Sequence, residues 1–267
     1  MTIEQPVWTG LVPVDDTALA VTDTRGPGRP LVYLNGSYAD QSHWRRVITD
    51  LGGDFRHITY DERARGRSQR SADYSFEACV RDLDAVLEAR GVERPILVGW
   101  SYGAALAMHW AARNPDRALG VVSVDGAFPH DWLDDAARAQ IRKLFRRLSP
   151  LFPVARRLGL AARMSAAQHA EINIEANELC APGALNPVFD RVTAPVRYVV
   201  ATGGNLGGDA TLMEEIRANL DPVLARNPNF KVSAKVASNH SKILRKDFRA
   251  VADAVRELAG DRERTIG

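Results

Sequence analysis

The stretch 96–106 constrains the fold of this chain most strongly, because an apolar run enters a Gly-x-Ser-x-Gly turn and leaves as an alanine-rich helical pattern. A strand that turns so abruptly into a helix holds its central residue in a strained backbone conformation, and the flanking Gly99 and Gly103 leave room for the tight crossing. The hydroxyl of Ser101 then stands clear of the backbone, in front of the N–H groups that begin the helix. We interpret Ser101 as a nucleophile; the alternative is an ordinary strand–turn–helix with an exposed serine.

Composition limits the class of protein. The chain has 267 residues, of which 45% are hydrophobic and 25% are charged, as expected for a single globular α/β domain. Its 35 basic and 33 acidic residues leave a net charge of +2, which predicts no nucleic-acid partner. No apolar run approaches the ~18 residues of a membrane-spanning helix, so we expect no integral membrane contact. The first residues lack the pattern of a signal peptide, and Cys79 and Cys180 have no metal-like spacing, so we expect free thiols and a cytoplasmic protein.

Apolar runs and helical patterns alternate along most of the chain. The expected strands are residues 7–14, 19–23, 31–34, 55–60, 96–99, 119–124, 196–201 and 230–236. The expected helices outside the central region are 42–51, 75–90, the one that ends at 113, 212–225 and 247–258. This order predicts an α/β fold with a mostly parallel sheet and helices on both faces.

Between residues 128 and 190 the alternation stops, and three helical patterns follow one another over 131–148, 153–164 and 165–179. We therefore predict a core made of 1–127 and 191–267 and an inserted helical lid made of 128–190. Residues 131–167 hold eight basic and three acidic side chains, a net charge of 8 − 3 = +5. This charge either attracts an acidic ligand, partner or membrane surface or forms a solvated face, and we favour the solvated face. The basic residues are Arg138, Arg142, Lys143, Arg146, Arg147, Arg156, Arg157 and Arg163.

Four motifs follow strands and together extend over nearly the whole chain: Asn35-Gly36-Ser37, the charged loop 61–68, the turn 99–103 and His240. In this order and spacing they resemble the α/β-hydrolase family, in its esterase-like branch with a helical lid. The resemblance implies an α/β-hydrolase fold with an eight-stranded, mostly parallel sheet. It also implies that ligands bind at the carboxyl ends of the strands, where these loops gather.

A serine hydroxyl needs a base within hydrogen-bond distance before it can act as a nucleophile at neutral pH. Of the six histidines, His240 lies in the loop between the last strand and the last helix, where the family places its base. His43 and His130 are in loops near the mouth of the expected pocket, and we expect structural roles for both. His109 is in the helix that follows Ser101 and points away from it. We therefore expect His240 to be the base.

The imidazole in turn needs a carboxylate that fixes its tautomer and stabilises its cation. The commonest family pattern has an aspartate shortly after the glycine that closes the seventh strand, but this chain has Asn205 and Leu206 there. Asp209 lies further on, where a carboxylate at a helix start explains it adequately. Asp125, at the tip of the sixth strand, occupies the place that some members use, haloalkane dehalogenases among them. We favour Asp125 as the acid and keep Asp209 as the alternative; the plain interpretation of Asp125 is a strand-end turn.

The resemblance also implies an oxyanion hole made by the N–H groups of Tyr102 and Ser37, and such donors typically contribute ~3 kcal/mol each to a tetrahedral intermediate. A simple turn serine is the alternative for Ser37. In the loop 61–68, we expect Asp61 and Arg63 to hold the backbone and to take no part in the chemistry. Aromatic residues near the mouth are expected to line an apolar substrate pocket, or in two cases to be plain core. They are Tyr38, Trp100, Phe128 and Trp132, of which Trp100 and Phe128 suit either place.

These residues predict a cofactor-independent serine hydrolase that cleaves a carboxylic ester, lactone or thioester through an acyl-enzyme on Ser101. The expected partner is a small, uncharged acyl substrate. The sequence leaves open whether the chain forms a homodimer. The alternatives are C–C bond hydrolysis or perhydrolysis by the same residues, or a ligand-binding protein with little turnover. Epoxide hydrolases and dehalogenases of this family use aspartate at the position of Ser101, which argues against both activities. No metal site is expected, because His240 has no neighbours at ligand spacing.

Overall fold

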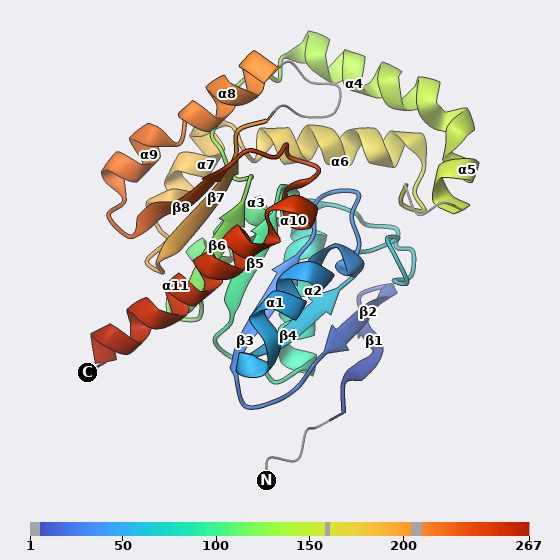
Figure 1. Ribbon diagram of the computed structural model, residues 1–267. Coiled ribbons are helices and arrows are strands. Elements are labelled where there is room, and N and C mark those ends of the chain that lie inside the picture. Colours follow the sequence, from blue (N-terminus) through green and yellow to red (C-terminus); the bar gives the residue numbers. More distant parts are fainter. Residues whose placement is uncertain (1–5, 158–160, 204–209, 267) are drawn as a thin grey trace.

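The structure, a computed structural model, describes residues 6–157, 161–203 and 210–266 and contains an eight-stranded sheet flanked by helices (Figure 1). The strands are β1 (Trp8–Val14), β2 (Thr17–Asp23), β3 (Arg29–Leu34), β4 (Phe55–Tyr60), β5 (Ile96–Trp100), β6 (Gly120–Val124), β7 (Val196–Ala201) and β8 (Phe230–Val236). Their order across the sheet is β1-β2-β4-β3-β5-β6-β7-β8. The sheet confirms the predicted fold class, and each predicted strand lies at its expected place.

Strand direction reverses at one edge of the sheet. β1 and β2 form the predicted antiparallel hairpin, in which Trp8 pairs with Asp23 and Val14 with Thr17. β2 also runs antiparallel to β4, whereas the six strands from β4 to β8 across the sheet (β4, β3, β5, β6, β7 and β8) run parallel to one another. The carboxyl ends of these parallel strands therefore meet at one edge, and the loops that follow them lie together.

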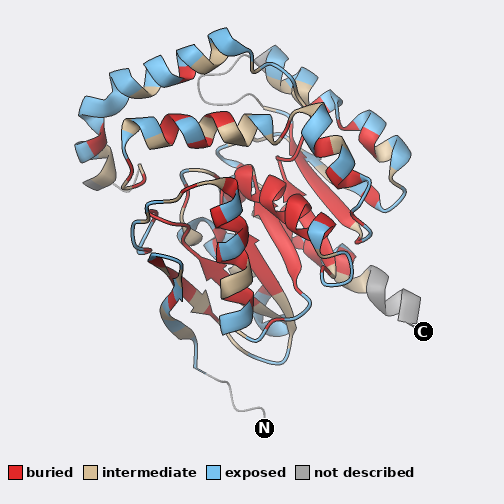
Figure 2. Cartoon of the chain, turned by 180° about the vertical axis from the view of Figure 1, so that it is seen from behind, coloured by how far each residue is buried: buried red, intermediate tan, exposed pale blue. Residues whose placement is uncertain are grey.

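Two layers of helices bury the two faces of the sheet, and the central strands are accordingly buried in Figure 2, whereas the edge strands β1 and β8 are mostly intermediate or exposed. One layer consists of α1 (Arg45–Leu51), α10 (Ile243–Lys246) and α11 (Phe248–Ile266), and the other of α2 (Phe76–Ala89), α3 (Tyr102–Arg113), α7 (Pro182–Phe189) and α9 (Asp221–Arg226). Leu97 of β5 packs with the second layer and its neighbour Val98 with the first. Because successive side chains of a strand point to opposite faces, both faces of β5 have to be apolar.

Among the described residues between β6 and β7, where the sequence predicts an insertion, there are four helices (Figure 1). They are α4 (Asp135–Leu148), α5 (Phe152–Arg157), α6 (Ala166–Glu178) and α7. α4 packs against α6, and both lie across one end of the sheet. Residues 161–164 are not helical, so the predicted helix 153–164 is too long. α7 was not predicted; Pro182 lies in its first turn, where a missing N–H costs nothing.

The predicted helix 212–225 is divided into α8 (Ala210–Ala218) and α9. Pro222 lies in the first turn of α9, and a proline there cannot donate the N–H bond that an uninterrupted helix would require. Short 3-10 segments occur at η1 (Gln41–Trp44), η2 (Gly52–Asp54) and η3 (Ser149–Leu151). Within the described parts of the chain, no helix combines the length and the apolar character needed to cross a membrane.

The basic side chains of the inserted helices are partly paired. Arg138 contacts Glu178 at 3.0 Å and Arg142 contacts Glu171 at 2.8 Å, both between α4 and α6. Arg163 donates to backbone carbonyls of the loop 61–68. Arg138, Arg142 and Arg163 therefore have partners within the protein itself.

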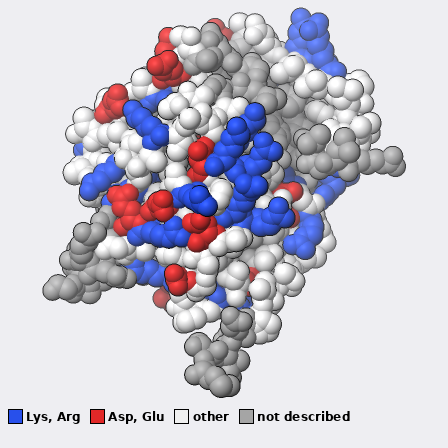
Figure 3. All heavy atoms as spheres, viewed as in Figure 1, with Lys and Arg blue, Asp and Glu red and all other residues white. Residues whose placement is uncertain are grey.

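Charges of both signs share the face that carries α1 and α11. Figure 3 shows basic side chains gathered near its centre with acidic ones beside them. Asp50 of α1, for example, accepts from Arg256 of α11 at 2.9 Å. Exposed pairs of this kind typically contribute only about 0–1 kcal/mol to the free energy of unfolding.

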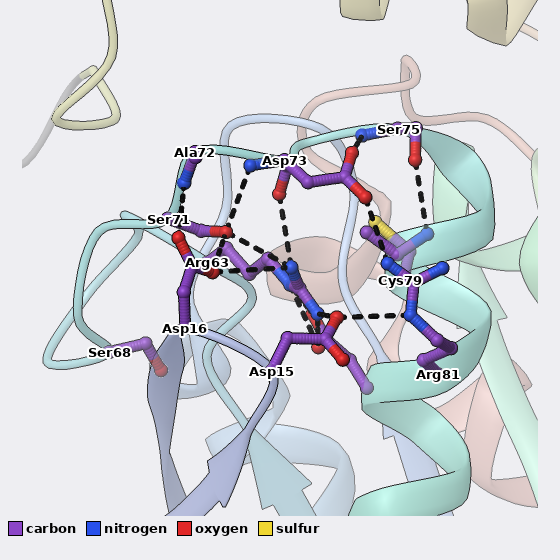
Figure 4. Close-up of polar contacts among 12 residues, drawn as sticks. Asp15, Asp16, Arg63, Ser68, Ser71, Ala72, Asp73, Ser75, Cys79 and Arg81 are labelled. Carbon is purple, nitrogen blue, oxygen red and sulfur yellow. Dashed lines mark hydrogen bonds and ion pairs between the residues drawn. The ribbon is translucent and has the colours of Figure 1, made fainter.

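The loop after β4 is fastened by one buried guanidinium (Figure 4). Arg63 is 1% exposed and contacts both carboxylate oxygens of Asp82 on α2, with N···O distances of 2.7 to 2.9 Å. It also donates to Asp15 of the β1–β2 turn at 2.7 Å and to Ser71 at 3.0 Å. Asp61 accepts the backbone N–H groups of Gln41, in the segment before α1, and of Arg67, in its own loop. Asp61 and Arg63 therefore hold the backbone, as the sequence predicts.

Replacement of Asp82 tests this buried pair. Asp82→Asn leaves a guanidinium buried without its main counter-charge, so we expect the free energy of unfolding to fall by about 3 kcal/mol. Glu77→Gln is the matched control, because Glu77 and Arg113 form an exposed pair at 2.7 Å and its loss is expected to cost under about 1 kcal/mol. Urea unfolding measures both, and equal losses in the two variants would show that burial of the Arg63 pair is unimportant.

Candidate active site

The predicted turn between β5 and α3 is strained at Ser101. Its backbone has φ 57° and ψ −117°, a left-handed conformation that L-residues rarely adopt. A Cβ on Gly103 would lie 2.1 Å from the carbonyl oxygen of Leu34, and one on Gly99 would lie 2.3 Å from the carbonyl oxygen of Gly103. Both positions therefore require glycine, and the crossing of strand and helix holds Ser101 at the carboxyl end of β5.

Three of the predicted residues form one hydrogen-bonded chain. His240 Nε2 lies 2.9 Å from Ser101 Oγ, and His240 Nδ1 lies 2.9 Å from Asp125 Oδ2. This geometry suits the neutral tautomer in which Nδ1–H donates to the carboxylate and Nε2 accepts from the serine hydroxyl. Ser101, His240 and Asp125 follow β5, β8 and β6, so the sheet brings them together.

Asp125 is buried yet held in its ionised form. It follows β6 at φ 44° and is 2% exposed. Burial by itself would raise the pKa of the Asp125 carboxyl, but hydrogen bonds from His240 and Arg217 hold it below its ordinary value. The structure thus places Asp125 where the acid was predicted. The alternative, Asp209, lies outside the described residues.

Arg217 is a member of this cluster that the sequence did not indicate. Its guanidinium donates to both oxygens of Asp125, through Nε at 3.0 Å and Nη2 at 2.8 Å. Arginines are numerous in this chain, and the spacing of Arg217 in α8 gives no sign that it reaches the end of β6. The one indirect signal for such a residue was Asp125 itself, because a carboxylate that is buried and charged requires a partner.

The backbone N–H groups of Ser37 and Tyr102 are available as anion donors. Both residues line the same cavity as Ser101, and neither N–H has an acceptor in the described part of the chain. Tyr102 is the first residue of α3, where helix N–H groups are unpaired and the helix dipole favours negative charge. Arg65 Nε donates to the Ser37 carbonyl at 2.8 Å and fixes that loop.

A buried polar cluster supports the loop that carries Ser37. Asn35 donates its backbone N–H and its side-chain amide to Glu62, at 3.1 and 2.8 Å, and accepts from Trp44 Nε1 at 2.8 Å. Burial raises the pKa of Glu62 to about 7, although Arg65 and the hydrogen bonds from Asn35 act in the opposite direction. Glu62 therefore titrates near neutral pH next to the candidate oxyanion loop.

A cavity of about 330 Å³ lies over Ser101 and His240. Its apolar lining is drawn from α3, the segment after β6 and α8, and its polar lining from the segment after β6 and α6. The apolar residues are Ala105, Phe128, Trp132, Leu212, Met213 and Ile216, and the polar ones include His130, Asn173 and Asn177. A cavity of this size and mixed lining suits a small organic ligand.

Two of the four predicted pocket residues are in the lining, and two are not. Phe128 and Trp132 line the cavity, whereas Tyr38 and Trp100 lie outside it. Trp100 is 9% exposed, and its ring packs between those of His43 and His240, with centroids 5.9 and 5.6 Å away. Tyr38 is turned toward the inserted helices, where its ring lies 5.7 Å from that of His169. Trp100, the last residue of β5, therefore has the core place that the sequence also allowed. The pocket prediction was wrong for Tyr38, because position in a loop does not fix the direction of a side chain.

The other histidines near the mouth have structural contacts. His130 lines the cavity, where its ring lies 3.0 Å from Asn177 Oδ1 and 2.8 Å from the Phe128 carbonyl. His43 pairs with Asp40, which raises the pKa of its ring. His109 is buried in α3, and burial lowers the pKa of its ring to about 4. None of the three is within the hydrogen-bonded chain of Ser101.

The raised pKa of Glu62 makes stability depend on pH. Because the folded chain holds the Glu62 proton up to about pH 7, whereas an ordinary carboxyl loses it near 4.5, the folded state binds more protons in between. This contribution to stability is complete below 4.5 and is lost as the pH rises through about 7. We expect the difference in free energy of unfolding, wild type minus Glu62→Gln, to decrease from about pH 5 to about pH 8. The comparison cancels the other titrating groups; Glu88→Gln is the exposed control, and a difference that stays constant would contradict the assignment.

The chain is similar to known proteins in sequence and in fold. A family model described as alpha/beta hydrolase fold matches residues 29–202. A haloalkane dehalogenase of Mesorhizobium japonicum is 33% identical over 139 residues, which are 51% of this chain and 45% of that protein. A pimeloyl-[acyl-carrier protein] methyl ester esterase of Chromobacterium violaceum is 30% identical over 161 residues, 58% of this chain and 61% of that protein. The chain thus spans about half the length of these relatives.

Solved structures share the fold of nearly the whole chain, although their sequences have little identity with it. A thermophilic esterase from Thermogutta terrifontis superposes with a TM-score of 0.72 at 18% identity, over 95% of this chain and 98% of that one. Such low identity shows a shared fold, and activity has to be argued from the site. Since the family match extends over residues 29–202 and the sheet order and the strained serine turn agree with it, the chain belongs to the α/β-hydrolase fold family.

Proposed function

We propose that this protein is a serine hydrolase that cleaves a carboxylic ester, lactone or thioester through an acyl-enzyme on Ser101. The observation that carries the proposal is the continuous chain of hydrogen bonds from Ser101 Oγ through His240 to Asp125, with 2.9 Å at each step. A nucleophile, a base and an acid in this relation define acyl-transfer chemistry irrespective of fold.

The first half-reaction transfers the acyl group to the enzyme. Ser101 Oγ attacks the carbonyl carbon while His240 Nε2 takes its proton, and the carbonyl oxygen becomes an oxyanion held by the N–H groups of Ser37 and Tyr102. Collapse of this intermediate breaks the bond to the leaving oxygen or sulfur, which departs with the proton from His240. In the second half-reaction His240 takes a proton from water, whose oxygen attacks the ester carbonyl on Ser101. The bond between the acyl carbon and Ser101 Oγ then breaks, Oγ regains the proton from His240, and the acid is released.

Serine at this position favours acyl chemistry over the displacement of halide. Attack of a serine oxygen on an alkyl halide would leave an ether, which water does not cleave, whereas an acyl ester on Ser101 is readily hydrolysed. A carboxylate nucleophile avoids this dead end because its product with an alkyl group is again an ester. The similarity to a haloalkane dehalogenase therefore supports the fold of this chain and not its substrate. Ser101 as the nucleophile favours an acyl substrate over an alkyl halide.

The cavity indicates a small substrate with one polar group. Its volume of about 330 Å³ lies near the lower end for organic ligands, which argues against long acyl chains. Phe128, Met213 and Ile216 offer apolar contact, and Asn173 and Asn177 offer hydrogen bonds on the α6 side. We propose an uncharged acyl substrate of small to medium size.

Removal of the nucleophile tests the proposal. Ser101→Ala is expected to lower kcat for short p-nitrophenyl esters by about 10⁴-fold or more, because no oxygen remains to carry the acyl group. Ser149→Ala, in η3 of the inserted helices, is the control and is expected to leave kcat unchanged. Equal rates in Ser101→Ala and the wild type would refute the acyl-enzyme mechanism. A wild type that binds esters without turnover would refute it too and would favour a binding protein.

The identity of the acid is tested by two matched amides. Asp125→Asn is expected to lower kcat by about 10⁴-fold, because an amide favours the wrong imidazole tautomer and cannot stabilise its cation. Asp209→Asn is expected to keep wild-type kcat. The same ester assay measures both variants, and loss confined to Asp209→Asn would move the acid to that residue.

A further inference from the structure

The ion pair between Asp125 and Arg217 is buried and two-pronged. Arg217, on α8, is 8% exposed, and its Nε and Nη2 reach Oδ1 and Oδ2 of Asp125 at 3.0 and 2.8 Å. The third nitrogen, Nη1, donates to the Gly203 carbonyl at 2.7 Å. The guanidinium is thus held between the ends of β6 and β7, and two parallel N–H···O bonds give this pair a defined plane.

Each oxygen of the Asp125 carboxylate receives two donors. Oδ1 accepts from the backbone N–H of Ala201 at 3.0 Å and from Arg217 Nε. Oδ2 accepts from Arg217 Nη2 and lies 2.9 Å from His240 Nδ1. The carboxylate cannot rotate without breaking several charge-assisted bonds, so its orientation toward His240 is fixed by Arg217 as well as by the backbone.

The same contact changes the charge of the site. In a serine–histidine–aspartate arrangement, the carboxylate stabilises the imidazolium that forms when histidine takes the serine proton. Here Asp125 already faces a full positive charge, and the two groups together are neutral. A nearby cation disfavours a second cation, and Arg217 Nη2 and His240 Nδ1 share one oxygen of Asp125, Oδ2.

We propose that Arg217 is a positioning residue of this active site: it fixes the plane of Asp125 and reduces the proton affinity of the Asp125–His240 pair, so that the base stays free at lower pH. The inference rests on the proposed function. Arg217 then has two separate effects. Its hydrogen bonds orient the carboxylate and so govern the maximal rate, and its charge governs the pH at which the rate falls.

Other charged groups surround this pair and stay constant in the tests. Glu214, Asp221 and Lys235 line the cleft beside Arg217, and no ion pair joins them to it among the described residues. On the far side of Trp100, His43 and Asp40 form the next charged pair. His130 lines the substrate cavity. Their influence on His240 cancels when variants of Arg217 are compared with the wild type.

Two substitutions of Arg217 distinguish charge from geometry. The rate at which a fluorophosphonate labels Ser101, and kcat/KM for p-nitrophenyl acetate, are measured from acidic to alkaline pH. Arg217→Met removes charge and hydrogen bonds, so we expect the midpoint of the acid limb to rise by about one pH unit and the alkaline plateau to fall by about 10- to 100-fold. Arg217→Lys keeps the charge and loses the planar fork, so the plateau is expected to fall with the midpoint unchanged.

The controls keep the inference falsifiable. Arg226→Met removes an arginine from the neighbouring helix α9, where it contacts Asn186 at 3.2 Å, and is expected to retain the wild-type profile. If Arg217→Met does not fold, Arg217→Gln, which keeps donors without charge, is expected to show the same rise of the midpoint. An acid limb that stays in place in Arg217→Met or Arg217→Gln would overturn the inference.

Failure of the inference is distinct from failure of the proposed function. A wild type that neither labels at Ser101 nor turns over would refute the proposed function. The ring signals of His240, followed by NMR as pH changes, still test the inference in that case, and their titration midpoint is expected to rise in Arg217→Met. An unchanged midpoint would refute it without reference to activity.

Discussion

The hydrogen-bonded chain from Ser101 through His240 to Asp125 is the interaction on which the rest depends, because its two links join residues 139 and 115 positions apart in the sequence. Chain connectivity cannot hold such distant groups at 2.9 Å. The sheet does so, since β5, β6 and β8 run in the same direction and end at one edge. Two buried helical layers keep the strands in register and thereby position the reacting atoms.

Much of the site could be predicted from the sequence, because order along a parallel sheet determines which loops meet. Ser101 followed from the glycines around it, and His240 from its place between the last strand and the last helix. The choice between Asp125 and Asp209 stayed open, since each follows a strand whose end lies at the same edge. Arg217 was not foreseen, because the reach of a long side chain depends on where α8 packs, which no local pattern encodes.

The fold was predictable where periodicity decides it and less so where packing does. Each strand lies at its expected place, because buried parallel strands are continuous apolar runs. The helix 212–225 was predicted without a break because its apolar spacing continues past Pro222, whose missing donor ends the pattern. Tyr38 was assigned to the cavity from its place near the mouth, and Trp100 was left between cavity and core, because side-chain direction depends on partners such as His169 and His43.

The central claim, that an acyl group passes through Ser101, is tested most directly by trapping it. The protein is mixed with a p-nitrophenyl ester, quenched in acid within the first turnovers, and its peptides are weighed by mass spectrometry. The peptide that contains Ser101 is expected to carry the mass of the acyl group, and no peptide of Ser101→Ala is expected to carry it. Continued release of p-nitrophenol by Ser101→Ala, with no acyl group ever found on Ser101 in the wild type, would contradict the claim.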